Sequence, residues 1–550
     1  MARMGWTGRA GVALAAIVAA SAASAASAAS AASAASAQSD DIARIVDEGM
    51  NRSHVMLTAH ELVDGIGARL TNSPAMRRAE GWALGKFASY GLRDPRREAF
   101  AFGRGWEIVS ASATMLGPRP MPLDMIPVAW TPGTNGPLRA EVFVAPISKI
   151  EHFEAYRGKL AGKIVMISLP GEGSEQTKPG FVRYDGAAIK EFDEYDQPDF
   201  DPEAVARRPL RADFPLKLDA FLKSEGALAW VRVSRRDGGL LHGEGYTYAV
   251  GKTPTLPGIE LSAEDYRRLA RFARTGAAPT LEINSNVRFD DRDANGYNII
   301  ADLPGTDPRA GYVMAGAHID SWVAGDGAVD NGAGTAVVVE AARILSTLGI
   351  RPKRTIRFAL WSGEEQGLIG SLGYIEKHLA SRPMTPGASV DENYARWSTR
   401  YPITRRAGFG DLKAYFNMDN GSGKFRGIYA ENNSGAVPLL KAWLDPFAAM
   451  GAGTVVAGRT TGTDHVYLQS IGVPGFQFIQ DPLDYGVRLH HSSADTLDHM
   501  KGDDLRQAAV VMAGVLLAAA NSDKELPRPP LPTQPNATDP FKYDYPPEPQ

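Results

Sequence analysis

The sequence contains no cysteine, and this absence excludes disulfide bonds, thiolate metal ligands and a cysteine nucleophile. It also lacks a block of like charge. Its 59 basic and 63 acidic residues are spread along the chain, so nucleic acid is not an expected partner. No Gly-x-Ser-x-Gly motif occurs, which argues against a serine α/β-hydrolase. The 550 residues, 44% of them hydrophobic, are enough for more than one domain.

The N-terminus lacks an apolar run long enough to cross a membrane. Arg3 and Arg9 precede the short run GVALAAIVAA, and repeats of Ala and Ser then lead to AQSDD. This order predicts a signal peptide over residues 1–37, cleaved after Ala37. The alternative is an Ala/Ser helix that stays attached as an anchor, but its apolar core is shorter than the roughly 20 residues that span a bilayer. We therefore expect a secreted or periplasmic protein with no membrane segment after leader removal.

Three regions differ in their hydrophobic pattern. From Asp40 to about Leu92 apolar residues recur at helical spacing, and from Trp106 to Ile283 short β-rich runs alternate with Gly/Pro turns. From Asn298 onward, strand-like runs such as GYVMAGAHID and TIRFALWSG alternate with helical stretches such as TAVVVEAARILSTLG. This alternation predicts an α/β fold in which helices cover both faces of a mostly parallel sheet.

Metal-capable side chains follow nearly every strand of this last region. Because parallel strands present their carboxyl ends at one edge of a sheet, we expect these side chains to meet there. One acid at a strand end is more often a surface or capping residue, but so many at one edge indicate a metal site. The candidates are His318, Asp320, Asp330, Glu364, Glu365, Asp419 and His491.

The ligand types favour zinc. Without Asp320 and one of the two glutamates, two histidines and three carboxylates remain, a set that suits zinc, with cobalt and manganese as alternatives. One catalytic zinc ion usually takes about three protein ligands plus water. Two ions about 3.5–4 Å apart would use all five ligands if one carboxylate bridges them. Asp330, in the glycine-rich stretch GAVDNGAG, is best placed to bridge. We expect two zinc ions per chain.

The remaining acids have predicted supporting roles. Asp320 lies two residues after His318, so in a strand both side chains point the same way, and the carboxylate could orient the imidazole. The alternative for Asp320 is a helix or turn cap. Glu364 and Glu365 point apart as neighbours in a turn. One of them can therefore bind metal while the other acts as the general base on a metal-activated water.

Five stretches resemble a known family: HIDSW, GAVDNGAG, LWSGEEQG, FNMD and HHSSADTLD. They are similar to the di-zinc exopeptidases that include bacterial leucyl aminopeptidases and glutamate carboxypeptidase II. The residues of HIDSW and HHSSADT resemble those of the carboxypeptidase Q branch, also called plasma glutamate carboxypeptidase. The resemblance to the family spans about residues 40–522. It implies one zinc on His318 and Asp419, a second on Glu365 and His491, Asp330 as the bridge and Glu364 as the base.

The resemblance also implies a domain division. The stretches YRGKLAGKIVMISLPG and KSEGALAWV are similar to a protease-associated domain inserted in a three-layer αβα peptidase domain. We therefore expect a catalytic domain formed by residues 38–125 and 286–525, an insert at 126–285, and a proline-rich tail at 526–550. In several members of the family, the peptide bond that follows the bridging aspartate, here Asp330–Asn331, is cis.

The chain departs from the family pattern beside the second histidine ligand. Some relatives have a tyrosine there that stabilises the oxyanion, whereas this chain has His490. The role could fall to His490, Tyr485 or His465. Asp464 and His465, in TGTDHVYLQSIGVPG, match a family loop near the substrate, with a purely structural loop as the alternative.

These features predict an exported di-zinc exopeptidase that hydrolyses short peptides or dipeptides. Many relatives in the carboxypeptidase Q branch are homodimers, so a homodimer is implied by the resemblance alone. An aminopeptidase of the same family, a single-zinc acyltransferase like the glutaminyl cyclases, and a non-catalytic relative like transferrin receptor are the alternatives. The sequence does not decide which end of the substrate is recognised. Candidate cations for a terminal carboxylate are Arg426, Lys424 and Arg459.

Overall fold

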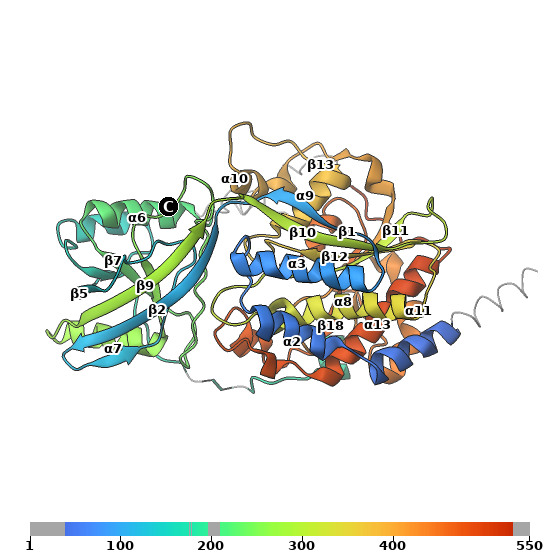
Figure 1. The fold of residues 1–550 in the computed structure, drawn as a ribbon, viewed down its shortest axis with the longest axis horizontal. Coiled ribbons are helices and arrows are strands. Elements are labelled where there is room, and N and C mark those ends of the chain that lie inside the picture. The colour runs from blue at the N-terminus through green and yellow to red at the C-terminus, as the bar shows by residue number, and fades with distance from the viewer. Residues whose placement is uncertain (1–38, 175, 178, 196–209, 532–550) are drawn as a thin grey trace, which may run out of the picture.

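The computed structural model describes residues 39–174, 176–177, 179–195 and 210–531, which fold around two eight-stranded sheets (Figure 1). The predicted leader, residues 1–37, lies outside the described residues. Of the predicted tail at 526–550, residues 532–550 also lie outside them. No helix in the described part is long and apolar enough to cross a membrane. Residues 39–51 are helical and precede the first sheet.

The first sheet is mixed, with a parallel centre. Strands β12, β11, β15 and β18 run parallel to one another, and β16 and β17 form a second parallel pair. The antiparallel pairings are β1 with β10, β10 with β12, and β16 with β18. In sheet order the strands are β1 (Arg93–Ala101), β10 (Asn295–Leu303), β12 (Thr355–Trp361), β11 (Tyr312–His318), β15 (Leu412–Asn417), β18 (Gly475–Gln480), β16 (Phe425–Tyr429) and β17 (Thr454–Val456).

Helices cover both faces of this sheet, which confirms the predicted three-layer αβα architecture. In β11, Val313 and Ala315 belong to one hydrophobic cluster, and Tyr312 and Met314 belong to the other, because successive strand residues point to opposite faces. The first face is covered by α2 (Val55–Ile66), α3 (Pro74–Ser89), α8 (Ala333–Thr347), α11 (Val437–Leu444) and α13 (Gly502–Asn521). The second face is covered by α9 (Ile369–His378) and α12 (His465–Gln469).

The central helix α8 explains why the sequence stretch TAVVVEAARILSTLG is so apolar. Every residue from Ala333 to Leu345 is buried, because α8 packs on the sheet and also against α2 and α13. A helix surrounded in this way buries its whole circumference rather than one stripe. Its N-terminal end is directed at the edge of the sheet where the candidate metal ligands lie.

The second sheet corresponds to the β-rich pattern predicted from Trp106 to Ile283. It has the order β3-β2-β9-β5-β6-β7-β8-β4 and is packed against α6 (Asp213–Ser224) and α7 (Ala263–Arg274). Its strands are β2 (Gly105–Gly117), β3 (Met121–Leu123), β4 (Met125–Pro127), β5 (Leu138–Val144), β6 (Ile164–Met166), β7 (Ala229–Val233), β8 (Gly258–Leu261) and β9 (Thr280–Asp290). The strands thus run from Gly105 to Asp290, while the insert bounds of 126 and 285 stay a prediction.

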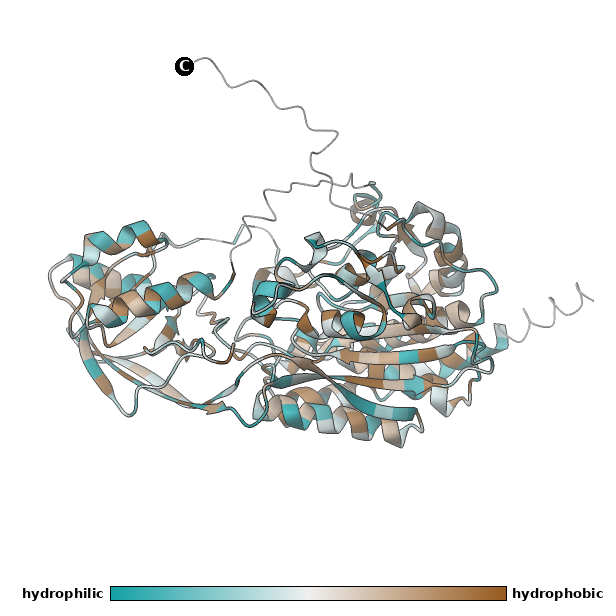
Figure 2. Cartoon of the chain, turned by 90° about the horizontal axis from the view of Figure 1, so that it is seen from above, coloured by the Kyte–Doolittle hydropathy of each residue, from teal (hydrophilic) through white to brown (hydrophobic). Residues whose placement is uncertain are grey.

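Short elements complete the described fold. They include α4 (Gly186–Lys190), α10 (Val390–Tyr394), β13 (Ala380–Ser381) and β14 (Thr404–Arg405), together with several short 3-10 turns. Seen from above, the second sheet and its helices form a separate lobe beside the larger αβα lobe (Figure 2).

An aromatic cluster joins the two lobes next to the candidate site. The rings of Phe102 and Tyr248 stack with centroids 4.5 Å apart, and Trp130 contacts Trp322 edge-on at 6.3 Å. Trp322 belongs to the HIDSW stretch of the first lobe, whereas Trp130 and Tyr248 lie in loops of the second. Aromatic packing of this kind buries a large apolar area, so it holds the second lobe against the candidate metal ligands.

Candidate metal centre

The candidate ligands gather at one edge of the first sheet, as the strand pattern predicts. His318 ends β11, and Asp419 follows β15 by two residues. Glu364 and Glu365 lie in the turn between β12 and α9, and Asp330 precedes α8. His491 follows β18, in a loop that contains the single helical turn Tyr485–Leu489.

Asp330 lies between the two histidines. Its Oδ1 is 3.3 Å from Nε2 of His318, and its Oδ2 is 3.3 Å from Nε2 of His491. On the first side Asp419 Oδ1 lies 3.5 Å from His318 Nε2, and on the second side Glu365 Oε2 lies 2.9 Å from His491 Nε2. The two oxygens of one carboxylate therefore face two separate histidine–carboxylate pairs.

Glu364 approaches the first pair and not the second. Its Oε2 lies 3.9 Å from His318 Nε2, and it groups with His318 and Asp419 as side chains close enough to share an ion. Glu365, its neighbour, turns to His491. The two side chains therefore point to different histidines, and their division into a base and a metal ligand stays a prediction.

The centre carries more buried polar groups than its protein partners satisfy. His318 Nε2, Asp330 Oδ2 and Glu365 Oε1 are buried without a hydrogen-bond partner among the described residues. A buried polar atom without a partner costs free energy, and a cation bound among these atoms would offset that cost. The residues present therefore fit a metal centre.

The acids and histidines of the centre shift one another's pKa values. Burial raises the pKa of Glu365 to about 7, against the opposing charge of His491. Burial also raises the pKa of Glu364 well above its ordinary value. The pKa of His318 is raised despite its burial, because Asp419 and Glu364 favour its charged form. Bound cations would replace these protons, since carboxylates and imidazoles bind metal only when deprotonated.

Buried residues support the loop that carries Asp330. Burial alone would raise the pKa of Asp330, but His318 and His491 hold it well below its usual range. Asp495 accepts hydrogen bonds from the backbone N–H groups of Val329 (2.7 Å) and Asp330 (3.1 Å). The peptide bond between Asp330 and Asn331 is cis, as the resemblance implies. Asn331 is itself held, because its side-chain amide donates to the carbonyl of Met418 at 2.8 Å.

Arg69 anchors the preceding part of the same loop. Its fully buried guanidinium donates to the backbone carbonyls of Ile319 (2.7 Å), Asp326 (2.8 Å) and Gly327 (2.7 Å). It lies in the GARLTNSP stretch after α2, so the N-terminal helices are tied directly to the candidate centre. Sequence reasoning placed this stretch in a loop without giving Arg69 a role.

Asp320 differs in detail from its predicted role. The hydrogen-bond partner of His318 Nδ1 is the backbone carbonyl of Asp320 at 3.0 Å, while the Asp320 carboxylate is 3.7 Å away. That carboxylate instead accepts the backbone N–H groups of Glu364 and Glu365, each at 3.3 Å, and the hydroxyl of Thr71 at 2.9 Å. Asp320 therefore supports the turn that carries both glutamates, and orients the imidazole through its main chain.

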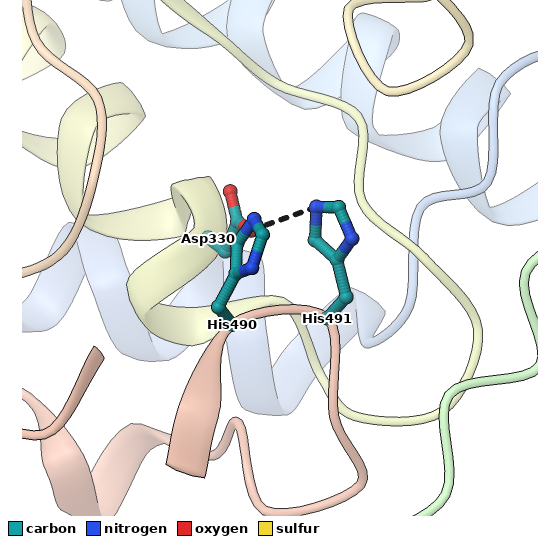
Figure 3. A group of neighbouring side chains, drawn as sticks. All are labelled: Asp330, His490 and His491. Atoms are coloured by element: carbon teal, nitrogen blue, oxygen red, sulfur yellow. Dashed lines mark ion pairs between the residues drawn. The ribbon is translucent and has the colours of Figure 1, made fainter. Parts of the chain in front are cut away.

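Two of the four proposed substrate residues lie at the centre. Figure 3 shows the rings of His490 and His491 rising from one loop beside Asp330, and the ring centroids are 3.7 Å apart. His490 Nε2 is 3.8 Å from Asp330 Oδ2, its side chain is 35% exposed, and burial lowers its pKa to about 4. Tyr485 packs against His490 with the ring centroids 5.0 Å apart.

The other two lie beneath the surface. His465 is fully buried, with Nε2 3.2 Å from Glu431 Oε1. Asp464 is also fully buried, and burial raises its pKa to about 7. Among the candidate cations, Arg426 is already engaged, because its Nε and Nη2 contact the two oxygens of Asp481 at 2.8 and 2.7 Å.

Sequence reasoning missed a contact from the second lobe. Glu244, in the loop between β7 and β8, has Oε1 2.8 Å from Nδ1 of His491. Arg235 of the same loop approaches that oxygen, with Nη1 also 2.8 Å away. The available signal was an acid between two glycines in HGEGY, but nothing in the sequence connects it to a residue 247 positions later.

The comparisons with known proteins agree with this geometry. A family model described as Peptidase family M28 matches residues 298–516, the part of the chain that carries all the candidate ligands. Carboxypeptidase Q of Mus musculus is 28% identical over 480 residues, which cover 87% of this chain and 87% of that protein. The chain thus contains a peptidase family M28 domain, which spans residues 298–516. It is therefore a zinc exopeptidase in its general class.

Solved structures agree on the fold of this M28 peptidase. An M28 peptidase precursor from Shewanella amazonensis has a TM-score of 0.64 at 23% identity, and the match covers 90% of this chain and 99% of that one. A zinc aminopeptidase from Bacillus subtilis, named BSAP, has a TM-score of 0.54 at 18% identity and covers 86% and 95% of the two chains. At these identities the likeness concerns the fold alone.

Proposed function

We propose that this M28 peptidase binds two zinc ions and hydrolyses short peptides or dipeptides. The observation that carries the proposal is Asp330, whose two oxygens each lie 3.3 Å from a different histidine. In the proposed arrangement His318 and Asp419 would hold one ion, Glu365 and His491 would hold the other, and Asp330 would be shared between them. Zinc bound there would acidify a water molecule and polarise the substrate carbonyl.

Glu364 is the proposed general base. Its carboxylate lies beside His318, while Glu365 is engaged with His491. Glu364 would take a proton from the attacking water and later deliver it to the nitrogen of the leaving amine. Asp320 supports this role, since its carboxylate accepts the backbone N–H of Glu364.

His490 and Tyr485 are the proposed oxyanion-side residues. Both lie on the His491 loop, and His490 is partly exposed next to Asp330. Burial raises the pKa of Tyr485 well above its ordinary value, so its hydroxyl keeps its proton and can donate a hydrogen bond. Donors aimed at the developing negative charge are a large source of transition-state stabilisation. Asp464 and His465 have no exposed surface and are assigned instead to the support of the site.

Guanidinium groups at the edge of the site favour recognition of a terminal carboxylate. Arg211 Nη1 lies 3.4 Å from the carbonyl of Glu365, and Arg236 Nη1 donates to the carbonyl of His490 at 2.8 Å. Neither forms an ion pair with a carboxylate among the described residues. Of the neighbouring acids, Asp495 uses both carboxylate oxygens for backbone N–H groups, and Glu244 already uses Oε1 for His491. A carboxypeptidase is therefore preferred to an aminopeptidase.

The remaining features of the proposal concern location and access. The leader pattern at residues 1–37 supports export to the periplasm or the medium. The second lobe, which carries Arg211, Arg236 and Glu244 beside the metal centre, would limit the site to short peptides. The domain division, a protease-associated identity for that lobe and a homodimer belong to the same proposal.

Blocked dipeptides test the function directly. We would measure hydrolysis of an unblocked dipeptide such as Ala-Leu beside its N-acetylated and C-amidated forms, each with and without a zinc chelator. The proposal expects chelator-sensitive cleavage that is lost on amidation. Loss on acetylation alone would indicate the aminopeptidase alternative. Cleavage of none of them by protein with two zinc ions would contradict the proposal and favour an acyltransferase like the glutaminyl cyclases.

A further inference from the structure

Glu244 connects the second lobe to a candidate metal ligand. The Nδ1 atom of His491 and the Oε1 atom of Glu244 are 2.8 Å apart, while Nε2 of the same ring points to Glu365 and Asp330. An imidazole that uses Nε2 for a metal carries its proton on Nδ1 and needs an acceptor there. Glu244 is placed to be that acceptor, and it comes from the other lobe.

We propose that Glu244 is a positioning residue for the zinc ligand His491, so that the second lobe completes the metal centre. The inference rests on the proposed role of His491 as a ligand. A carboxylate acceptor fixes the ring orientation and makes the coordinating nitrogen a stronger donor. Glu244 would thereby increase the affinity for the ion held by Glu365 and His491 without touching the substrate.

The loop that carries Glu244 is held in place by other contacts. Leu241 and Ser493 exchange two hydrogen bonds, one between Leu241 N–H and the Ser493 hydroxyl (3.1 Å) and one between Ser493 N–H and the Leu241 carbonyl (2.8 Å). A Cβ on Gly245 would lie 2.2 Å from the carbonyl oxygen of Ala129, so only glycine permits this close approach. Changing Glu244 should therefore leave the loop docked.

Arg235 provides an internal check on the proposal. Its Nη1 lies 2.8 Å from the same Oε1 atom that faces His491. The guanidinium draws charge from the carboxylate and weakens Glu244 as an acceptor for the imidazole. Removing Glu244 and removing Arg235 should therefore change zinc affinity in opposite directions. A merely structural ion pair would instead be damaged equally by the loss of either partner.

The experiment measures zinc binding to the full chain. Zinc affinity is determined by competition with a chromophoric chelator for wild type, Glu244→Gln, Arg235→Met and the control Glu282→Gln, which removes a carboxylate of the second lobe paired with Arg139. Circular dichroism and thermal unfolding with EDTA check that each variant folds. We expect Glu244→Gln to lower the affinity for one of the two zinc ions by about 10- to 100-fold. We expect Arg235→Met to raise this affinity and Glu282→Gln to leave it unchanged.

The outcomes separate this inference from the proposed function. Wild type that binds two zinc ions, with unchanged affinity in folded Glu244→Gln, would overturn the inference alone. The inference would also be overturned if Arg235→Met lowered the affinity for the same zinc ion as much as Glu244→Gln does. A merely structural ion pair between Arg235 and Glu244 would then explain both results. Wild type that binds no zinc would contradict the proposed function and the inference with it.

Discussion

The backbone N–H of Glu364 donates a hydrogen bond to the carboxylate of Asp320 across 3.3 Å. The next N–H, that of Glu365, reaches the other oxygen of the same carboxylate at the same distance. One buried acid thus fixes the turn from which a candidate base and a candidate metal ligand project. Asp320 influences the chemistry through the position of these two residues and through its carbonyl contact with His318.

Replacing Asp320 with Asn should disturb that turn. The amide can accept only on one side, and its NH2 group would face an N–H donor, so Glu364 should lose its position. We expect kcat to fall by about 10- to 100-fold on a short peptide. Thr71→Val is the matched control, because it removes only the hydroxyl contact to Asp320 and should have the smaller effect. Equal activity of Asp320→Asn and wild type would contradict this account of the turn.

Replacing Arg211 with Met should affect substrates with a free terminal carboxylate. The methionine keeps much of the apolar stem beside Tyr246, whose ring lies 4.6 Å from the Arg211 guanidinium carbon, but removes the charge. A hydrogen bond to a charged group contributes about 1.5–3 kcal/mol, so kcat/KM should fall by roughly 10-fold or more. The comparison is a C-amidated substrate, which should be cleaved at equally low rates by both proteins. An unchanged kcat/KM for the free carboxylate would remove Arg211 from the proposed subsite.

The ion pair between Glu98 and His378 should make the first lobe sensitive to acid. Burial alone would raise the pKa of Glu98, but His378 Nε2 at 2.6 Å and Arg96 lower it to about 2, and its side chain is only 6% exposed. A depressed folded-state pKa adds stability that is present above the unfolded value near 4.3 and is lost as pH falls toward 2. This interval corresponds to about 3 kcal/mol.

Urea unfolding of wild type and Glu98→Gln checks this prediction. With EDTA present, so that metal release does not contribute, wild type should exceed the variant in free energy of unfolding at pH 6. The difference should shrink as the pH falls from about 5 toward 2. A difference that stays constant over this interval would show that the charge of Glu98 does not stabilise the fold.

The strand and helix pattern of the first lobe was predictable because its periodicity is strong. The runs that contain His318 and Trp361 form the parallel strands β11 and β12, and α8 follows from its apolar stretch. The short strands β16 and β17 were not foreseen. The five residues of β16 include Gly427 at the centre, and its pairing with β18 depends on a chain reversal that no local pattern encodes. Strands as short as these carry little hydrophobic signal of their own.

The candidate site was predictable to the extent that residue type and strand position determine it. The ligands come from strand ends, so a sheet rule brings them together. Glu244, Arg211 and Asp495 escaped that reasoning, because each reaches the centre from a loop. The contacts of Glu244 and Arg211 also depend on how the second lobe packs on the first. The aromatic cluster around Trp322 is part of that packing, and its members are scattered along the sequence.

The central claim is that this protein hydrolyses peptides with zinc and a glutamate base. The most direct test compares the turnover of Glu364→Gln and wild type on a short peptide while zinc content is measured in both. The account predicts that the variant keeps two zinc ions and loses at least about 10²-fold in turnover, because the amide cannot accept the proton from water. Wild-type turnover by Glu364→Gln with two zinc ions bound would contradict it.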